Sequence, residues 1–339
     1  MDPLTHALAG ATIAWAAGGR ALGRRALLVG AAAGLLPDAD VLIRSAADPL
    51  LAIEHHRGFT HSLAFVPVGG IVAALAFRAG AAWDRAQLRL AIVAGILAYA
   101  SHGLLDAATT YGTQLFWPFS RYRVGLDVLS IIDPLFTTIL LGGALAAFAG
   151  RRRLALTALA LALLWPGIGF VQRERATAAQ ARLAAARGEP RQRGAVFPTV
   201  GNTIVWRSIS QTGNRLRIDR IRVPWSGQAM YASADSVPVA SPDAVRGDAR
   251  MLRDFARFAW FSDGWVARAP ADPSIIGDAR YSLRADRYDP VWGIRFRAGK
   301  TPPTEWVNRT RERDVGMAQL WTEITGRNLT FRPVPERGD

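Results

Sequence analysis

The chain has 339 residues, half of them hydrophobic, a formal net charge of +14 and no cysteine. Without cysteine, neither a disulfide framework nor a thiolate metal site can form, so any metal must be bound by His, Asp, Glu, backbone or water. Nearly all the basic residues are Arg, and they are spread along the chain rather than gathered in a recognisable nucleic-acid-binding fold. We therefore expect no nucleic-acid partner.

Hydrophobic residues are distributed unevenly. Residues 1–172 contain several long apolar runs, whereas residues 173–339 are rich in Arg, Asp and Trp and contain none. Because a helix needs about 20 mainly apolar residues to cross the hydrocarbon core, the sequence predicts a membrane-embedded domain over residues 1–172. A basic helical connector lying on the lipid surface is predicted over residues 173–195, followed by a small soluble α+β domain over residues 196–339.

The predicted membrane domain is an α-helical bundle of about six apolar segments. These segments are residues 7–19, 26–43, 61–77, 88–106, 130–149 and 154–171. The first two are short and rich in small residues, and Pro37 interrupts the second, so they either span at a tilt or form a re-entrant hairpin. The opening residues lack the positive region and the cleavage site of a signal peptide, which predicts that the first segment is retained.

Arginine marks one side of the predicted bundle. On that side, nine arginines stand against a single acid, Asp84. The nine are Arg20, Arg24, Arg25, Arg78, Arg85, Arg89, Arg151, Arg152 and Arg153. By the positive-inside rule, this side is predicted to be cytoplasmic, so the other side and the C-terminal domain are expected to face the periplasm.

The C-terminal domain shows short alternating segments. Strands are predicted at residues 202–209, 214–223, 278–286 and 290–297, and helices at residues 241–260 and 314–326. The turn Thr212-Gly213-Asn214 predicts a hairpin between the first two strands. We find no histidine and no catalytic cluster in this half of the chain.

All five histidines lie within the first 102 residues, and each is expected at or near a helix end on the side opposite the arginine-rich loops. They are His6, His55, His56, His61 and His102. An acid or hydroxyl accompanies each of them, and the second apolar segment ends on the same side with Pro37-Asp38-Ala39-Asp40. This distribution predicts a metal site at one membrane face.

Two pairs of residues have spacing that suits a metal. His102 and Asp106 are four residues apart, which places both side chains on one helix face, where imidazole nitrogen and carboxylate oxygen can bind one cation. The alternative for this pair is a helix cap or a simple hydrogen bond. Asp38 and Asp40 bracket one residue after a helix-breaking proline and can project the same way, the alternative being a solvated helix end.

From these patterns we assign expected roles. The expected metal ligands are His6, Asp38, His61, His102 and Asp106. Asp40 is expected to be a bridging ligand or a general base. His55 and His56 diverge as neighbours, so one could bind metal while the other contacts substrate. His55, His56 or Arg57 is expected to steady the leaving group or the developing negative charge. Arg57 could hold a phosphate or carboxylate, the alternative being an ordinary interfacial arginine. Asp133, which precedes a proline, is expected to be either a helix cap or a hydrogen-bond partner of the metal ligands.

Four ordered motifs resemble the bacterial family known as membrane-bound metal-dependent hydrolases, over roughly residues 1–170. The motifs are Met1-Asp2-Pro3-Leu4-Thr5-His6, Leu36-Pro37-Asp38-Ala39-Asp40, His55-His56-Arg57-Gly58-Phe59-Thr60-His61-Ser62 and His102-Gly103-Leu104-Leu105-Asp106. The resemblance implies a metal-dependent hydrolase at the bacterial inner membrane, without naming a substrate.

The order of the motifs is also distantly similar to that of the zinc phospholipase C and P1 nuclease group. This likeness implies zinc and phosphoester chemistry. No histidine follows His102, so the ligands that would complete a three-metal cluster are missing. We therefore expect one or two divalent ions, with zinc ahead of manganese.

Together the motifs predict hydrolysis by a metal-activated water of a phosphoester or lipid-linked substrate, in contact with membrane lipids. A metal-ion transporter is one alternative, although transport sites usually lie near the bilayer midplane. A non-catalytic receptor or scaffold with a structural metal is another, and a closed, fully ligated site would favour it. The oligomeric state is left open.

Overall fold

The computed structural model describes the chain except for residues 79–80, 190, 284–286, 313–316, 329 and 336–339. The chain falls into two compact units. The first comprises Met1–Ile43 and His55–Phe170, and the second comprises Arg44–Glu54 and Val171–Asp339. The sequence did not predict that the segment 44–54 would belong with the C-terminal region.

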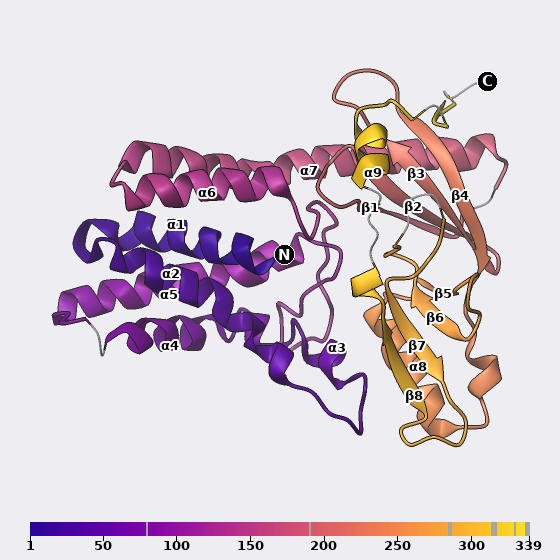
Figure 1. Cartoon of the computed structure of the whole chain (residues 1–339), viewed down its shortest axis with the longest axis horizontal. Helices are drawn as coiled ribbons and strands as arrows, with labels where there is room; N and C mark the ends of the chain where they lie inside the picture. The colour runs from indigo at the N-terminus through magenta and orange to yellow at the C-terminus, as the bar shows by residue number, and fades with distance from the viewer. Residues whose placement is uncertain (79–80, 190, 284–286, 313–316, 329, 336–339) are drawn as a thin grey trace. The chain divides into compact units, whose positions relative to one another are not determined.

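The helices of the first unit run side by side (Figure 1). They are α1 (Pro3–Leu22), α2 (Arg25–Leu35), α4 (Val66–Arg78), α5 (Arg85–Ala107), α6 (Pro134–Phe148) and the first half of α7 (Arg152–Ala186), with the short 3-10 helices η1 (Leu36–Leu42) and η2 (Phe59–His61). A helix therefore occurs at each of the predicted apolar segments. Helix α1 packs against α2, α5 and α6, and α4 packs against α5.

Only some of these helices are able to cross a membrane by themselves. Among the described residues, α5 and α7 are long and apolar enough to span. The bent pair Leu51–His61 and Val66–Arg78, which meet at 82°, adds a third span if the pair is counted as one. The structure therefore supports a helical membrane part with two or three spans, and the expected bundle of six segments is not confirmed.

Capping residues set where helices begin. The carboxylate of Asp2 accepts a hydrogen bond from the amide of Thr5 at 3.0 Å and begins α1. Asp133 accepts one from the amide of Phe136 at 3.1 Å, and its other oxygen accepts one from Trp165 Nε1 at 2.8 Å. Both oxygens of Asp133 are therefore engaged in starting α6 and joining it to α7, as expected for a cap.

Helices α1 and α2 pack backbone against backbone because glycines face each other. A Cβ atom on Gly10 would lie 2.2 Å from the carbonyl oxygen of Gly30, and one on Gly34 would lie 2.4 Å from that of His6. Small residues permit this approach where a larger side chain would separate the helices. The contact holds the end of α2, which leads directly into η1, beside the start of α1.

The second unit contains two antiparallel sheets with strand orders β1-β2-β3-β4-β9 and β5-β6-β7-β8 (Figure 1). The strands are β1 (Arg193–Pro198), β2 (Val205–Thr212), β3 (Arg215–Arg222), β4 (Met230–Pro238), β5 (Val266–Arg268), β6 (Ile275–Asp278), β7 (Trp292–Phe296), β8 (Thr304–Asn308) and β9 (Arg332–Pro333). The helices are α3 (Leu51–His55, whose last residue belongs to the first unit), the second half of α7, η3 (Pro242–Val245), α8 (Ala249–Phe261), η4 (Thr310–Glu312) and α9 (Met317–Ile324). The C-terminal region is therefore α+β, as predicted.

Several predicted elements are displaced. The expected hairpin is present as β2 and β3, but the expected helix at 241–260 is divided into η3 and α8. The strand expected at 278–286 ends earlier, as β6, and residues 284–286 lie outside the described residues. The strands β1, β4, β5, β8 and β9 were not predicted.

The expected connector is not a separate element, because α7 runs without interruption to Ala186. Ala176, Ala179 and Leu183 of this helix are buried against Val196 and Trp206 of the first sheet. Burial of an apolar face explains why the basic stretch continues as a helix packed on the sheet, and its placement at the lipid surface stays a prediction.

Helix α8 holds the segment 44–54 within the second unit. The guanidinium of Arg257 forms ion pairs with Asp48 at 2.9 Å and with Glu54 at 2.7 Å. The pairing with Asp48 is bidentate, since Nη1 and Nη2 each lie 2.9 Å from one of its oxygens. This interaction fixes the chain directly before the two adjacent histidines.

Candidate metal centre

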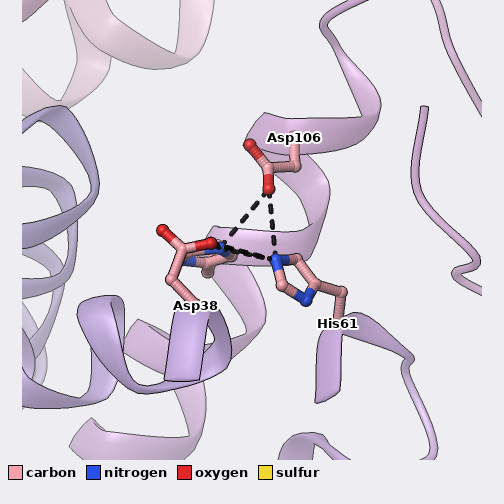
Figure 2. A group of neighbouring side chains, drawn as sticks. Asp38, His61 and Asp106 are labelled. Carbon is pink, nitrogen blue, oxygen red and sulfur yellow. Dashed lines mark hydrogen bonds and ion pairs between the residues drawn. The ribbon is translucent and has the colours of Figure 1, made fainter. Parts of the chain in front are cut away.

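Two ring nitrogens and two carboxylates converge at one point of the first unit. The Nε2 atoms of His61 and His102 are 2.9 Å apart, and Oδ1 of Asp38 lies 3.5 Å and 3.4 Å from them. Oδ2 of Asp106 lies 3.3 Å and 3.4 Å from the same two nitrogens. Figure 2 shows the side chains of Asp38, His61 and Asp106 pointing toward one another. One ligand atom from each of the four residues lies within 4.8 Å of all the others, which makes the group a candidate metal centre.

Three elements bring these residues together. Asp38 lies in η1, His61 ends η2, and His102 and Asp106 lie one turn apart in the last part of α5. The backbone of His61 packs directly on α5, because a Cβ atom on Gly103 would lie 2.5 Å from the His61 carbonyl oxygen. Gly103 is therefore a site residue that the sequence analysis did not single out.

Hydrogen bonds on the far side of each ring fix which nitrogen carries the proton. His102 Nδ1 lies 2.6 Å from the carbonyl oxygen of Gly34, which can only accept, so Nδ1 must carry the hydrogen. Thr60 Oγ1 donates to Asp40 at 2.9 Å and therefore accepts from His61 Nδ1 at 3.0 Å. In both neutral rings, Nε2 is left with its lone pair directed into the cluster.

The centre of the cluster therefore gathers acceptor atoms from all four residues. Two imidazole lone pairs meet carboxylate oxygens of Asp38 and Asp106, and Oδ2 of Asp106 is buried beside the Arg57 guanidinium, with which it forms an ion pair at 3.0 Å. Arg57 offsets the charge of Asp106 from one side, and the lone pairs that face one another suit a further cation, either a metal ion or a proton on His61. Two nitrogens and two carboxylate oxygens are a donor set that zinc and manganese accept, so these residues fit a divalent metal.

A second group of possible ligands, Asp38, Asp40 and His56, shares Asp38 with the first. In this group Asp40 is already occupied. Its Oδ1 lies 2.8 Å from His56 Nδ1, and its Oδ2 accepts hydrogen bonds from the Arg57 amide at 3.0 Å and from Thr60. The side chain is buried. These contacts, together with Oδ2 lying 3.2 Å from His61 Nδ1, show that Asp40 orients His61 and its loop, while its expected roles as bridging ligand or general base stay predictions.

Arg57 lies inside the protein, with only 3% of its surface exposed. Its backbone is left-handed, with φ 62°. Its Nε lies 3.0 Å from Oδ2 of Asp106, its Nη1 donates to Thr109 Oγ1 at 2.9 Å, and its guanidinium lies over the ring of Tyr111. The arginine is therefore an ion-pair partner of a candidate ligand, while its expected contact with substrate stays a prediction.

The remaining histidines differ in their distance from the cluster. His6 stacks on His102 with ring centroids 3.6 Å apart, and its Nε2 lies 3.1 Å from Oδ1 of Asp106. The amino group of Met1 lies 3.0 Å from the same nitrogen. His6 thus borders the group of four without belonging to it, and His55 belongs to neither group of candidate ligands in the described part of the chain.

Sequence reasoning missed several residues that position this centre. Gly34 contributes only a backbone carbonyl, which leaves no signal in the side-chain pattern. Tyr111 meets His56 edge-on at 5.4 Å, and Tyr99 donates a hydrogen bond to the carbonyl oxygen of Thr60 at 2.6 Å. Thr60 stands directly before His61 in one of the four motifs, and this adjacency was a visible signal for its contact with His61.

The fold and site thus define a helical membrane protein with a buried His/Asp cluster able to hold a metal ion. Residues 1–176 match the family described as YdjM inner membrane protein, and the chain belongs to that family. It is similar to the inner membrane protein YbcI of Escherichia coli (strain K12), with 36% identity over 122 residues that cover 35% of this chain and 69% of YbcI. No solved structure matches the chain. The matched family region includes the whole cluster and indicates a bacterial inner-membrane protein, as expected, while hydrolase activity and the likeness to P1 nuclease stay predictions.

Proposed function

We propose that this protein is a metal-dependent hydrolase of the bacterial inner membrane. The observation that best supports the proposal is the meeting of lone pairs from His61, His102, Asp38 and Asp106, with no hydrogen-bond donor of the cluster directed between them. Burying acceptors together is costly unless a cation joins them, so the arrangement suits a binding site better than a structural core.

The four residues would hold the ion, and the residues around them would fix its surroundings. A bound divalent ion supplies the means to make a water molecule a strong enough nucleophile near neutral pH. Gly34 and Asp40 hold the two imidazoles in the orientation that offers Nε2. Arg57 offsets the negative charge of Asp106 in surroundings that exclude water.

For the substrate, we propose a phosphoester or a lipid-linked group, with zinc as the ion ahead of manganese. The position of the cluster supports this choice of substrate. The cluster is built where apolar helices end, at the break between Leu51–His61 and Val66–Arg78 and in the final turns of α5. Such a place receives a substrate delivered along the membrane surface more readily than one held at the bilayer midplane. We also propose, from the arginine distribution, that this face is periplasmic.

The first experiment is the metal content of the full chain purified in detergent. The variants are Asp38→Asn and His102→Gln, which remove one ligand each, and the matched control is His55→Ala, a neighbouring histidine outside the cluster. We expect close to one or two ions in the wild type and in the control, and a clear loss in both ligand variants at unchanged helical circular dichroism. A wild type that stays empty after zinc or manganese is added would overturn the metal centre.

Activity is tested separately on the metal-loaded protein with bis-p-nitrophenyl phosphate and with phospholipids. Hydrolysis that disappears in His102→Gln and persists in a folded Gly142→Ala control, in which the added Cβ meets no atom within 4 Å, would support the proposed reaction. Metal binding without hydrolysis of any phosphoester or lipid substrate would instead favour a structural metal in a receptor or scaffold.

A further inference from the structure

A pocket whose lining includes two arginines lies in the C-terminal unit and shares no residue with the metal centre. Its volume is about 600 Å³. Three of its lining residues belong to α7, namely Arg175, Ala178 and Arg182. The others come from later parts of the chain and are Val223, Gly227, Gln228, Ala229 and Val334. Two of these residues carry a positive charge and none carries a negative charge.

The two arginines are presented by one face of α7. Arg175, Ala178 and Arg182 are three and four residues apart, the spacing that stacks side chains along a helix. Arg175 is held in place, since its Nη1 donates to Gln172 Oε1 at 2.6 Å, and Gln172 donates in turn to the carbonyl oxygen of Val223 at 3.0 Å. Within the described part of the chain, Arg182 makes no hydrogen bond or ion pair and lines the pocket, so its guanidinium is available to a ligand.

The position of the pocket along α7 indicates what kind of ligand it meets. This helix is apolar enough to span a membrane. Large side chains of α7 face outward along the chain as far as Phe170 and Val171, which are 53% and 58% exposed. From Ala176 onward its apolar face is buried against the first sheet instead. The helix therefore leaves the apolar phase close to residue 172.

Distances along the helix then place the pocket in the headgroup region. With a rise of about 1.5 Å per residue, Arg175 lies roughly 5 Å beyond the end of the apolar run, and Arg182 roughly 15 Å beyond it. The polar region on each side of the hydrocarbon core is about 5–8 Å thick. The near end of the pocket is thus level with lipid phosphates, and the far end reaches past them.

We propose that this pocket binds the phosphate-bearing headgroup of an acidic phospholipid. The planar guanidinium groups of Arg175 and Arg182 match phosphate oxygens in geometry and charge. Basic pockets beside a membrane-spanning helix are suited to acidic headgroups. Val223, Ala229 and Val334 supply an apolar wall for the glycerol and the first methylene groups. The lipid would secure the second unit of the chain to the membrane surface.

The test uses the full chain in detergent, titrated with phosphatidylglycerol or with phosphatidylcholine of identical acyl chains, and retained lipid is counted by native mass spectrometry. Arg175→Gln/Arg182→Gln removes the charges, and Ala178→Trp fills the pocket while keeping them. The matched control is Arg173→Gln, because Arg173 pairs with Glu174 on the same turn and does not line the pocket.

We expect the wild type and the Arg173→Gln control to retain phosphatidylglycerol at least tenfold more tightly than phosphatidylcholine. Both pocket variants should lose this preference at unchanged circular dichroism. Equal retention of the two lipids by the wild type would overturn the proposal. So would an equal loss in the Arg173→Gln control, which would indicate general surface charge, or equally tight binding of soluble glycerol 3-phosphate, which would indicate a free phosphate ligand.

Discussion

His102 Nδ1 donates a hydrogen bond of 2.6 Å to the carbonyl oxygen of Gly34, across 68 residues of sequence. This bond fixes the tautomer of His102 and directs Nε2 toward His61, Asp38 and Asp106. It depends on the close packing of α1 on α2, because Gly34 itself lies against the backbone of His6. The metal centre therefore rests on helix packing as well as on its ligands.

We predict that Gly34→Ala weakens metal binding without removing a ligand. The added Cβ would lie 2.4 Å from the His6 carbonyl oxygen, so the helices must separate and the carbonyl that orients His102 must move. Loss of such an outer partner typically lowers metal affinity by about 10–100-fold. The measurement is zinc affinity by competition with a chelating dye.

The matched control for this variant is Gly142→Ala in α6, where an added Cβ meets no atom within 4 Å. It should leave zinc affinity unchanged and stabilise the protein slightly, by about 0.4–1 kcal/mol. If both variants bind zinc as the wild type does, the Gly34 carbonyl has no part in shaping the site.

Asp40→Asn should weaken metal binding less than Asp38→Asn does. Asp40 contacts His56, Arg57 and Thr60 and orients His61, so its loss acts through another residue, whereas Asp38 offers an oxygen to the cluster itself. We expect a fall of about 10–100-fold for Asp40→Asn and no measurable binding for Asp38→Asn. Isothermal titration with zinc distinguishes the two, and the reverse order would identify Asp40 as the ligand.

Arg57→Ala should destabilise the metal-free protein more than the metal-loaded protein. The arginine and Asp106 are both buried, and removing one partner of a buried ion pair costs about 3–5 kcal/mol. A divalent ion beside Asp106 would supply much of the missing charge. Thermal unfolding followed by tryptophan fluorescence, with zinc and with a chelator, measures the difference, and an equal effect in both conditions would contradict it.

The contact between Asp48 and Arg257 should depend on pH. Burial raises the pKa of Asp48, but the hydrogen bonds from Arg257 outweigh burial and leave this pKa below its ordinary value. The ion pair is therefore fully formed above about pH 4, the usual range of an aspartate, and is lost as the pH falls through the lowered pKa. The pair is partly exposed, so its effect on stability should stay below about 1 kcal/mol.

Hydrogen exchange of the segment 44–54, corrected for the intrinsic rate, checks this prediction. Protection should decrease between pH 6 and pH 3 in the wild type. Asp48→Asn should show low protection at both values, because the amide lacks the charge at any pH. If Asp48→Asn were protected at pH 6 as strongly as the wild type is, Arg257 would not hold the segment through Asp48.

The sequence by itself was enough to find the parts of this protein that follow from local chemistry. Long apolar runs identified the helical membrane part, and alternation with a Gly-Asn turn identified the β2–β3 hairpin. The spacing of His102 and Asp106 and the sequence Pro37-Asp38 identified three of the four residues that the structure brings together. The fourth, His61, was also among the expected ligands. Helix periodicity and metal-ligand chemistry are both properties of short stretches, so they are readable without a fold.

Only the tertiary structure decided which candidates meet and what the others do. It separated Asp38 from Asp40, although they are two residues apart, because η1 directs one carboxylate to the cluster and the other to the loop holding His56 and Thr60. It buried Arg57 against Asp106, and it joined the segment 44–54 to α8. These outcomes depend on contacts between residues far apart in sequence, and such contacts are set by packing and charge pairing that no local pattern records.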